Sequence, residues 1–172
     1  MQTLRDIKEY ITYKAVPDCV SIINKKLPNF KLAVLKFDDA SDRRSHRGGM
    51  YSKGPGINLA MSLLKHWMDK QGIARFYEYP AFDDDSVIGG AYIVEGKTAI
   101  DIITAHEIAH AAQHYVYKLL NTRCKPHGPL WRDIYTTVRK EFVNGQLGNQ
   151  TKLKHVYEKQ LKEIKQELLA RV

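Results

Sequence analysis

Two histidines and a glutamate stand at a spacing that suits metal chemistry. Residues 105–110 read A-H-E-I-A-H, which is the pattern H-E-x-x-H. On a helix, His106 and His110 lie on one face, one turn apart, so both imidazoles can reach a single ion such as Zn²⁺. Glu107 is rotated by about 100° from His106, which places its carboxylate beside the ion rather than on it. The pattern therefore predicts a zinc site with a general base next to it.

The sequence around this pattern predicts a buried helix over residues 98–121. Projected at about 100° per residue, apolar side chains cover most of its circumference. These side chains are Ala99, Ile100, Ile102, Ile103, Ala111, Ala112, Tyr115, Val116, Leu119 and Leu120. Two histidines and a glutamate inside such a helix need polar partners, and a shared metal ion provides one. Thr98 and Asp101 are expected to form a variant of the capping box at its start.

A catalytic zinc site needs a third protein ligand and an open coordination position. The side chains that can serve are His114, His127, Asp133 and Glu141. His114 lies two turns from His106, about 12 Å along the helix axis, which is too far for one tetrahedral ion to bind both. His127 is preferred, because a loop histidine followed by Gly128 can be aimed back at the ion. The alternatives are an exposed loop histidine at this position and ligation by Glu141 on a following helix.

The pattern H-E-x-x-H, followed 17 residues later by H-G-P-L-W at residues 127–131, resembles the SprT-like metalloproteases, which include the Spartan-type DNA–protein crosslink proteases. Members carry H-E-x-x-H, a variable loop and then H-G-x-x-aromatic. Residues 47–60 are similar to the family's glycine-containing segment before an I-x-L edge strand. The resemblance covers residues 3–143, and Glu107 is then the general base. It implies that the zinc ligands are His106, His110 and His127.

The whole chain, residues 1–172, predicts one α+β domain. Helices are expected at residues 3–15, 18–27, 62–70, 98–121, 129–143 and 149–171. Pro17 is expected to separate the first two helices. Strands are expected at residues 30–37, 56–60, 73–79 and 91–94, with hairpins at 50–60 and 73–94. The expected fold is zincin-like, with a small antiparallel sheet, the H-E-x-x-H active-site helix and C-terminal helices, of which 149–172 is basic.

The net charge of +8 is unevenly spread along the chain. Residues 75–100 carry two basic and five acidic side chains, net −3, so the remainder carries +11. A basic surface favours DNA or another polyanion as a partner, although solubility alone also accounts for it. The expected DNA contacts are Arg43, Arg44, Arg47, Lys152, Lys154 and Lys162. The acidic triplet at 83–85 lacks the spacing of a calcium loop and is expected to be a solvated turn.

Other features limit the class of protein. No apolar run approaches about 18 residues, so no membrane-spanning helix is expected. The polar start of the chain lacks the apolar core of a signal peptide. Cys19 and Cys124 form no C-x-x-C pair, and two cysteines are too few for the four-cysteine zinc ribbon that many SprT-like proteins add. The expected setting is cytoplasmic, with association to the nucleoid and no membrane contact.

The motif and the resemblance together imply a zinc-dependent endopeptidase with one Zn²⁺ ion and a protein or peptide substrate, directed at DNA-associated proteins. The strand at 56–60 is expected to hold an extended peptide by strand addition. The options for stabilising the oxyanion are Tyr51, His114 and Tyr117. Two alternatives stay open: a non-proteolytic zinc-binding nucleic-acid or regulatory protein, and a metalloprotease that acts on a partner protein with no link to DNA.

Overall fold

The structure of the 172-residue chain is a computed structural model that describes residues 3–38, 49–52, 56–61, 73–78, 88, 90–121 and 125–143. Its helices are α1 (Leu4–Tyr10), α2 (Val16–Asn24), α4 (Gly96–Leu119) and α5 (Pro129–Val138), with the π-helical turns η1 (Ile11–Ala15) and η2 (Arg139–Val143). Its strands are β1 (Val34–Asp38), β2 (Gly49–Ser52), β3 (Gly56–Ala60), β4 (Ile73–Glu78) and β5 (Gly90–Glu95). The protein thus combines helices with small sheets, as expected for an α+β fold.

Several predicted features lie outside the described residues. They are the helices expected at 62–70 and 149–171, the acidic triplet at 83–85, the Tyr51 side chain, Cys124, and the basic side chains Arg43, Arg44, Arg47, Lys152, Lys154 and Lys162. Within the described parts of the chain, no helix is both long and apolar enough to cross a membrane.

The N-terminal helices form one continuous rod rather than two separate helices. Thr3 caps it: its hydroxyl accepts the Asp6 N–H at 3.1 Å, and its own N–H donates to the Asp6 carboxylate at 2.8 Å. The expectation that Pro17 interrupts the rod is wrong, because α1, η1 and α2 follow one another without a gap. Just before Pro17, the Val16 N–H bonds to the carbonyl of Ile11, five residues back. This widened turn leaves room for the proline ring, which would clash with a carbonyl in a regular α-helix.

The first sheet has three strands in the order β1-β3-β2. β2 and β3 form the expected antiparallel hairpin, but β1 runs parallel to β3, from Val34 opposite Gly56 to Asp38 opposite Ala60. The expectation of an antiparallel sheet is therefore wrong for β1. The chain between β1 and β3 includes β2, and this connection is long enough to allow β1 and β3 to pair in parallel. β4 and β5 form a separate antiparallel hairpin, as expected.

The central position of β3 corrects a second expectation. Residues 56–60 were expected to be an edge strand that holds a peptide, but β3 is paired with β1 on one side and with β2 on the other. Strand addition needs backbone groups that are not already bonded in the sheet. Among the described strands, β1 and β2 each have a side that no other strand pairs with.

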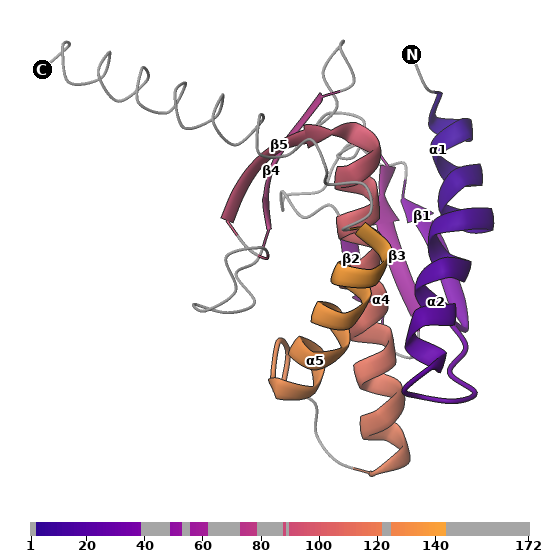
Figure 1. The fold of residues 1–172 in the computed structure, drawn as a ribbon. Coiled ribbons are helices and arrows are strands. Elements are labelled where there is room, and N and C mark those ends of the chain that lie inside the picture. The colour runs from indigo at the N-terminus through magenta and orange to yellow at the C-terminus, as the bar shows by residue number, and fades with distance from the viewer. Residues whose placement is uncertain are drawn as a thin grey trace, which may run out of the picture.

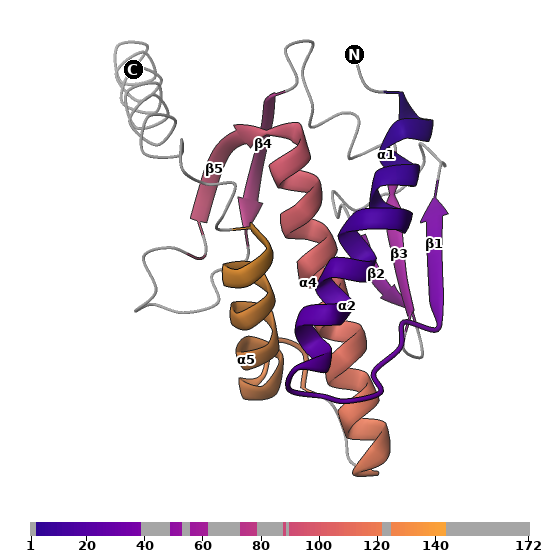
Figure 2. The ribbon, with the colours of Figure 1, turned by 45° about the vertical axis from the view of Figure 1, so that its right-hand side comes forward.

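Helix α4 runs through the middle of the molecule (Figure 1), with α1, α2 and the three-stranded sheet on one side and α5 and the β4–β5 hairpin on the other (Figure 2). It packs against α2, α5, β2 and β3. Most of its residues from Gly96 to Gln113 are buried, whereas Lys118, Leu119 and Leu120 at its end are exposed. The prediction of a buried helix around H-E-x-x-H is confirmed.

The start of α4 differs from the expected capping box. The helix begins at Gly96, and the side chain of Glu95 at the N-cap position makes no capping bond. Asp101 is instead fully buried and accepts hydrogen bonds from the Tyr10 hydroxyl at 2.7 Å and from Lys97 at 3.1 Å. The carboxylate therefore joins α4 to α1, a contact between distant segments that a local capping pattern does not encode.

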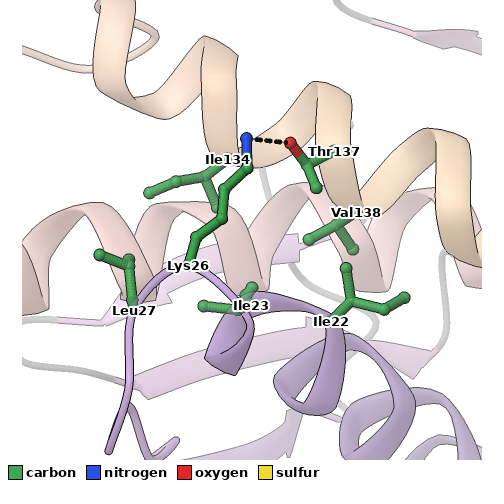
Figure 3. A pocket seen from close by; sticks show the side chains of 7 residues that line it. All are labelled: Ile22, Ile23, Lys26, Leu27, Ile134, Thr137 and Val138. Atoms are coloured by element: carbon green, nitrogen blue, oxygen red, sulfur yellow. Dashed lines mark hydrogen bonds between the residues drawn. The ribbon is translucent and has the colours of Figure 1, made fainter.

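Helix α5 is held in place by its contact with the end of α2. Figure 3 shows this seam, where apolar side chains from the two helices surround a small pocket. The lining residues are Ile22, Ile23, Lys26, Leu27, Ile134, Thr137 and Val138. Lys26 crosses the seam and donates to the Thr137 hydroxyl at 2.9 Å. None of the histidines lines this pocket, and the contacts around it join α2 to the helix that follows His127.

Candidate metal centre

Three histidines from two elements converge on one point. His106 and His110 come from α4, and His127 comes from the turn that leads into α5. The Nε2 atom of His127 lies 3.0 Å from Nε2 of His110 and 3.3 Å from Nε2 of His106. Their ligand atoms all lie within 4.8 Å of one another, close enough to hold a metal ion. No other such group of histidine, cysteine and carboxylate side chains occurs within the described ranges.

These spacings fit a shared cation. A metal–imidazole bond of about 2.0–2.1 Å and tetrahedral angles put two ligand nitrogens about 3.3 Å apart. A proton bridges only one pair of imidazole nitrogens, whereas a metal ion can bind all three. A set of three imidazoles suits transition-metal ions better than Mg²⁺ or Ca²⁺, which prefer oxygen ligands.

The local electrostatics keep two of the three imidazoles in the form that can bind a metal ion. Burial lowers the pKa of His106 well below its usual value of 6.5, and the nearby His110 and His127 lower it further. Burial also lowers the pKa of His110 to about 4; His127 adds to this effect, and Gln113 opposes it. Both imidazoles are therefore neutral near pH 7, and a neutral imidazole is the form that binds metals.

A strained turn presents His127. Its backbone φ of 54° lies in the left-handed region, which residues other than glycine seldom adopt. The Gly128 N–H closes the turn on the Lys125 carbonyl at 3.0 Å, and Arg132 donates to the His127 carbonyl at 3.1 Å. A Cβ atom on Gly128 would lie only 3.0 Å from the Lys125 carbonyl oxygen. Glycine is thus needed here for space, since its own φ of −72° is ordinary.

Trp131 forms the floor of the site. It is fully buried, and its ring centroid lies 4.9 Å from that of His106, 5.1 Å from that of His110 and 4.5 Å from that of His127. It is stacked on Tyr135 at 4.7 Å with 18° between the ring planes. A rigid indole in contact with all three imidazoles limits their rotation. The sequence pointed to Trp131 only as the aromatic residue of the family pattern.

A buried ion pair supports this aromatic floor from the β4–β5 hairpin. Arg139 donates through Nε and Nη2 to the Glu78 carboxylate at 2.9 and 3.2 Å, and both side chains are almost fully buried. The Tyr135 hydroxyl donates to the same carboxylate, and its ring lies 5.4 Å from that of His106. Burial first and then the Glu78 charge raise the pKa of Tyr135 well above 10, so its hydroxyl stays protonated. Sequence reasoning missed this network, because its members lie far apart in the chain.

The other residues proposed as the third ligand lie elsewhere. Asp133 pairs with Lys26 at 3.2 Å, and Glu141 pairs with Lys25 at 2.6 Å. His114 is half-buried on α4 and does not belong to the histidine group. The two described oxyanion options, His114 and Tyr117, are both partly exposed on α4.

Glu107 is buried on α4, with 7% of its surface exposed, and it is not part of the ligand group.

Comparison with family models, with curated proteins and with solved structures finds no match for this chain. What the protein does must therefore follow from the site. Three imidazoles converge on one point where they could hold a metal ion, and the buried Glu107 directly follows the first of them in the chain.

Proposed function

We propose that the chain is a zinc-dependent endopeptidase of the SprT-like type. The observation that carries this proposal is the convergence of three imidazole nitrogens, with Nε2 of His127 at 3.0 and 3.3 Å from those of His110 and His106. Zn²⁺ suits three nitrogen ligands in tetrahedral geometry. Structural zinc sites are usually closed by four protein ligands, whereas three leave one position open for water or substrate. A three-histidine site therefore favours catalysis over a structural role.

Glu107 is the residue that would move protons in this reaction. When bound, zinc supplies a Lewis acid and a water that is acidic near neutral pH. With zinc bound, the Glu107 carboxylate would act as the general base and would accept a proton from the water that adds to the scissile carbonyl carbon. Glu107 would then act as the general acid and deliver this proton to the amine nitrogen as the C–N bond breaks. The neutral His106 and His110 and the indole of Trp131 keep the ligand set in place during these steps.

The outer side of β2 is the proposed place for an extended peptide. β2 pairs with β3 on one side, and no described strand pairs with its other side. It also packs against α4, the helix that carries His106, Glu107 and His110. A peptide added to β2 would bond through its backbone, which suits a protease that accepts many sequences.

We further propose that the substrates include DNA-associated proteins. The support is the charge of +11 outside residues 75–100. Counterion release makes such binding fall steeply with salt. Binding to single-stranded DNA at low and moderate salt tests this part on its own: no binding at low salt would leave a protease without a DNA link.

The main proposal is tested on the purified protein. Elemental analysis should find one zinc ion per chain, and casein and histone should be cleaved. Removal of zinc by a chelator should abolish cleavage, and added zinc should restore it. A protein that binds zinc at this site but cleaves neither substrate would instead be the non-proteolytic zinc protein.

A further inference from the structure

We propose that Gln113 is a positioning residue that fixes His127 by holding the turn before α5 against α4. The inference rests on the metal site of the proposed function and adds a residue that neither H-E-x-x-H nor H-G-P-L-W contains. Gln113 lies one turn after His110 and is fully buried. It is the last buried residue of α4, and the helix residues after it are partly or fully exposed.

One backbone carbonyl ties the turn to the helix. The Gln113 amide donates through Nε2 to the carbonyl oxygen of Lys125 at 3.0 Å. The same oxygen accepts the Gly128 N–H at 3.0 Å. A carbonyl oxygen has two lone pairs and can satisfy both donors. Lys125 and Gly128 stand on either side of His127, so the Gln113 bond sets the distance between this turn and α4.

The conformation of His127 needs such support. A histidine at a φ of 54° is strained, and it keeps this backbone conformation only where its surroundings impose it. Arg132 also bonds to the turn, through the His127 carbonyl, but Arg132 is exposed. The Gln113 bond is part-buried and its donor side chain is fully buried, so water competes less for it than for the bond from Arg132.

The oxygen of the same amide adds no hydrogen bond within the described part of the protein that would favour glutamine for stability. Oε1 of Gln113 is buried and accepts no hydrogen bond from the described residues. A buried amide oxygen without a donor destabilises the folded state, and an apolar side chain of the same length would avoid that loss. Gln113 lies three residues after His110 and bonds to the turn that carries His127, so it links the helix of one ligand to the turn of another. Such supporting residues usually change metal affinity by about 10–100-fold.

The test compares zinc affinity across matched variants of the full chain. Gln113→Met keeps the length of the side chain and removes the donor, and Gln113→Leu serves if the first variant does not fold. Thr104→Val is the control, because Thr104 is another fully buried polar residue of α4 whose hydroxyl has no hydrogen-bond partner among the described residues. Affinity is measured by competition with a chelator, melting without metal checks folding, and the visible spectrum of the cobalt-loaded protein reports coordination geometry.

We expect Gln113→Met to weaken zinc binding by about 10–100-fold and to change the cobalt spectrum, with Thr104→Val within about 3-fold of the parent. In a His127→Ala background, Gln113→Met should weaken zinc binding by less than about 3-fold, because the ligand that Gln113 positions is already gone. An unchanged affinity and spectrum, or an equal loss in both backgrounds, overturns the inference while the parent still binds zinc and cleaves protein. A parent that binds no zinc overturns the proposed function as well.

Discussion

Trp131 stacks on His110, with 5.1 Å between the ring centroids and 28° between the ring planes. The same indole lies against His106 and His127. Any ion held by the three imidazoles would therefore lie close to the indole, which makes Trp131 an internal reporter of metal binding.

The first prediction uses this reporter. Trp67→Phe leaves Trp131 as the one tryptophan, since the chain has two. Co²⁺ binds sites that suit Zn²⁺, and as an open-shell ion it quenches nearby indoles. We expect Co²⁺ to quench most of the emission of this variant, and Zn²⁺ to reverse the quenching by displacement. Quenching that is present in the parent but lost in Trp67→Phe would show that the ion binds elsewhere.

A second prediction separates the third ligand from its rivals. His127→Ala should weaken zinc binding by more than the roughly 10–100-fold typical of a supporting residue, because it removes one of three ligands. Asp133→Ala and Glu141→Ala should retain zinc, since these carboxylates pair with Lys26 and Lys25. Zinc content after dialysis against a weak chelator shows which of the three variants retain the ion. Loss of zinc from Glu141→Ala, with His127→Ala unaffected, would reassign the ligand.

Glu107→Gln is expected to separate chemistry from metal binding. The change keeps the size of the side chain and removes the carboxylate, while His106, His110 and His127 remain. Zinc content and melting temperature should stay near those of the parent. Cleavage of casein should slow by about 10² to 10⁴-fold, the usual contribution of a general base. Cleavage at the parent rate would show that Glu107 is not the base.

The sequence could predict the parts of the site that depend on local spacing. The helix period alone puts His106 and His110 on one face, and the apolar residues around them predict burial. His127 was reached through its loop context and through the H-G-x-x-aromatic resemblance. Local patterns failed where a neighbouring feature changes the outcome, as at Pro17, whose ring the preceding π-helical turn accommodates.

Contacts between distant segments could not be predicted from spacing. Glu78 and Arg139 are 61 residues apart, and each taken alone is an ordinary charged residue. The parallel pairing of β1 with β3 depends on where the chain returns, which a short apolar stretch does not record. Gln113 is similar: its role depends on the Lys125 carbonyl, which no sequence pattern marks.

The metal-free protein should lose stability in mild acid. The pKa values of His106 and His110 are lowered in the folded state, so the unfolded chain binds protons more readily once the pH falls below 6.5. Their contribution to stability is therefore complete above about pH 6.5 and is lost as the pH falls toward about 4. Melting temperatures of the chelated protein over this range measure the loss. His110→Gln should flatten the dependence; an unchanged slope would contradict the assignment.

The last prediction concerns the pair that supports the aromatic floor. Glu78 and Arg139 are paired with 1% and 0% of their side chains exposed, whereas Lys26 and Asp133 are paired at 52% and 62%. Removing one partner of a buried pair leaves an uncompensated charge, so Glu78→Gln should lower the free energy of unfolding by about 3–5 kcal/mol. Lys26→Ala is the exposed control and should cost about 0–1 kcal/mol. Replacing both Glu78 and Arg139 by methionine should recover much of the loss, because no charge then stays buried. Urea unfolding measures all three, and a Glu78→Gln loss no larger than that of the control would show that water reaches this pair.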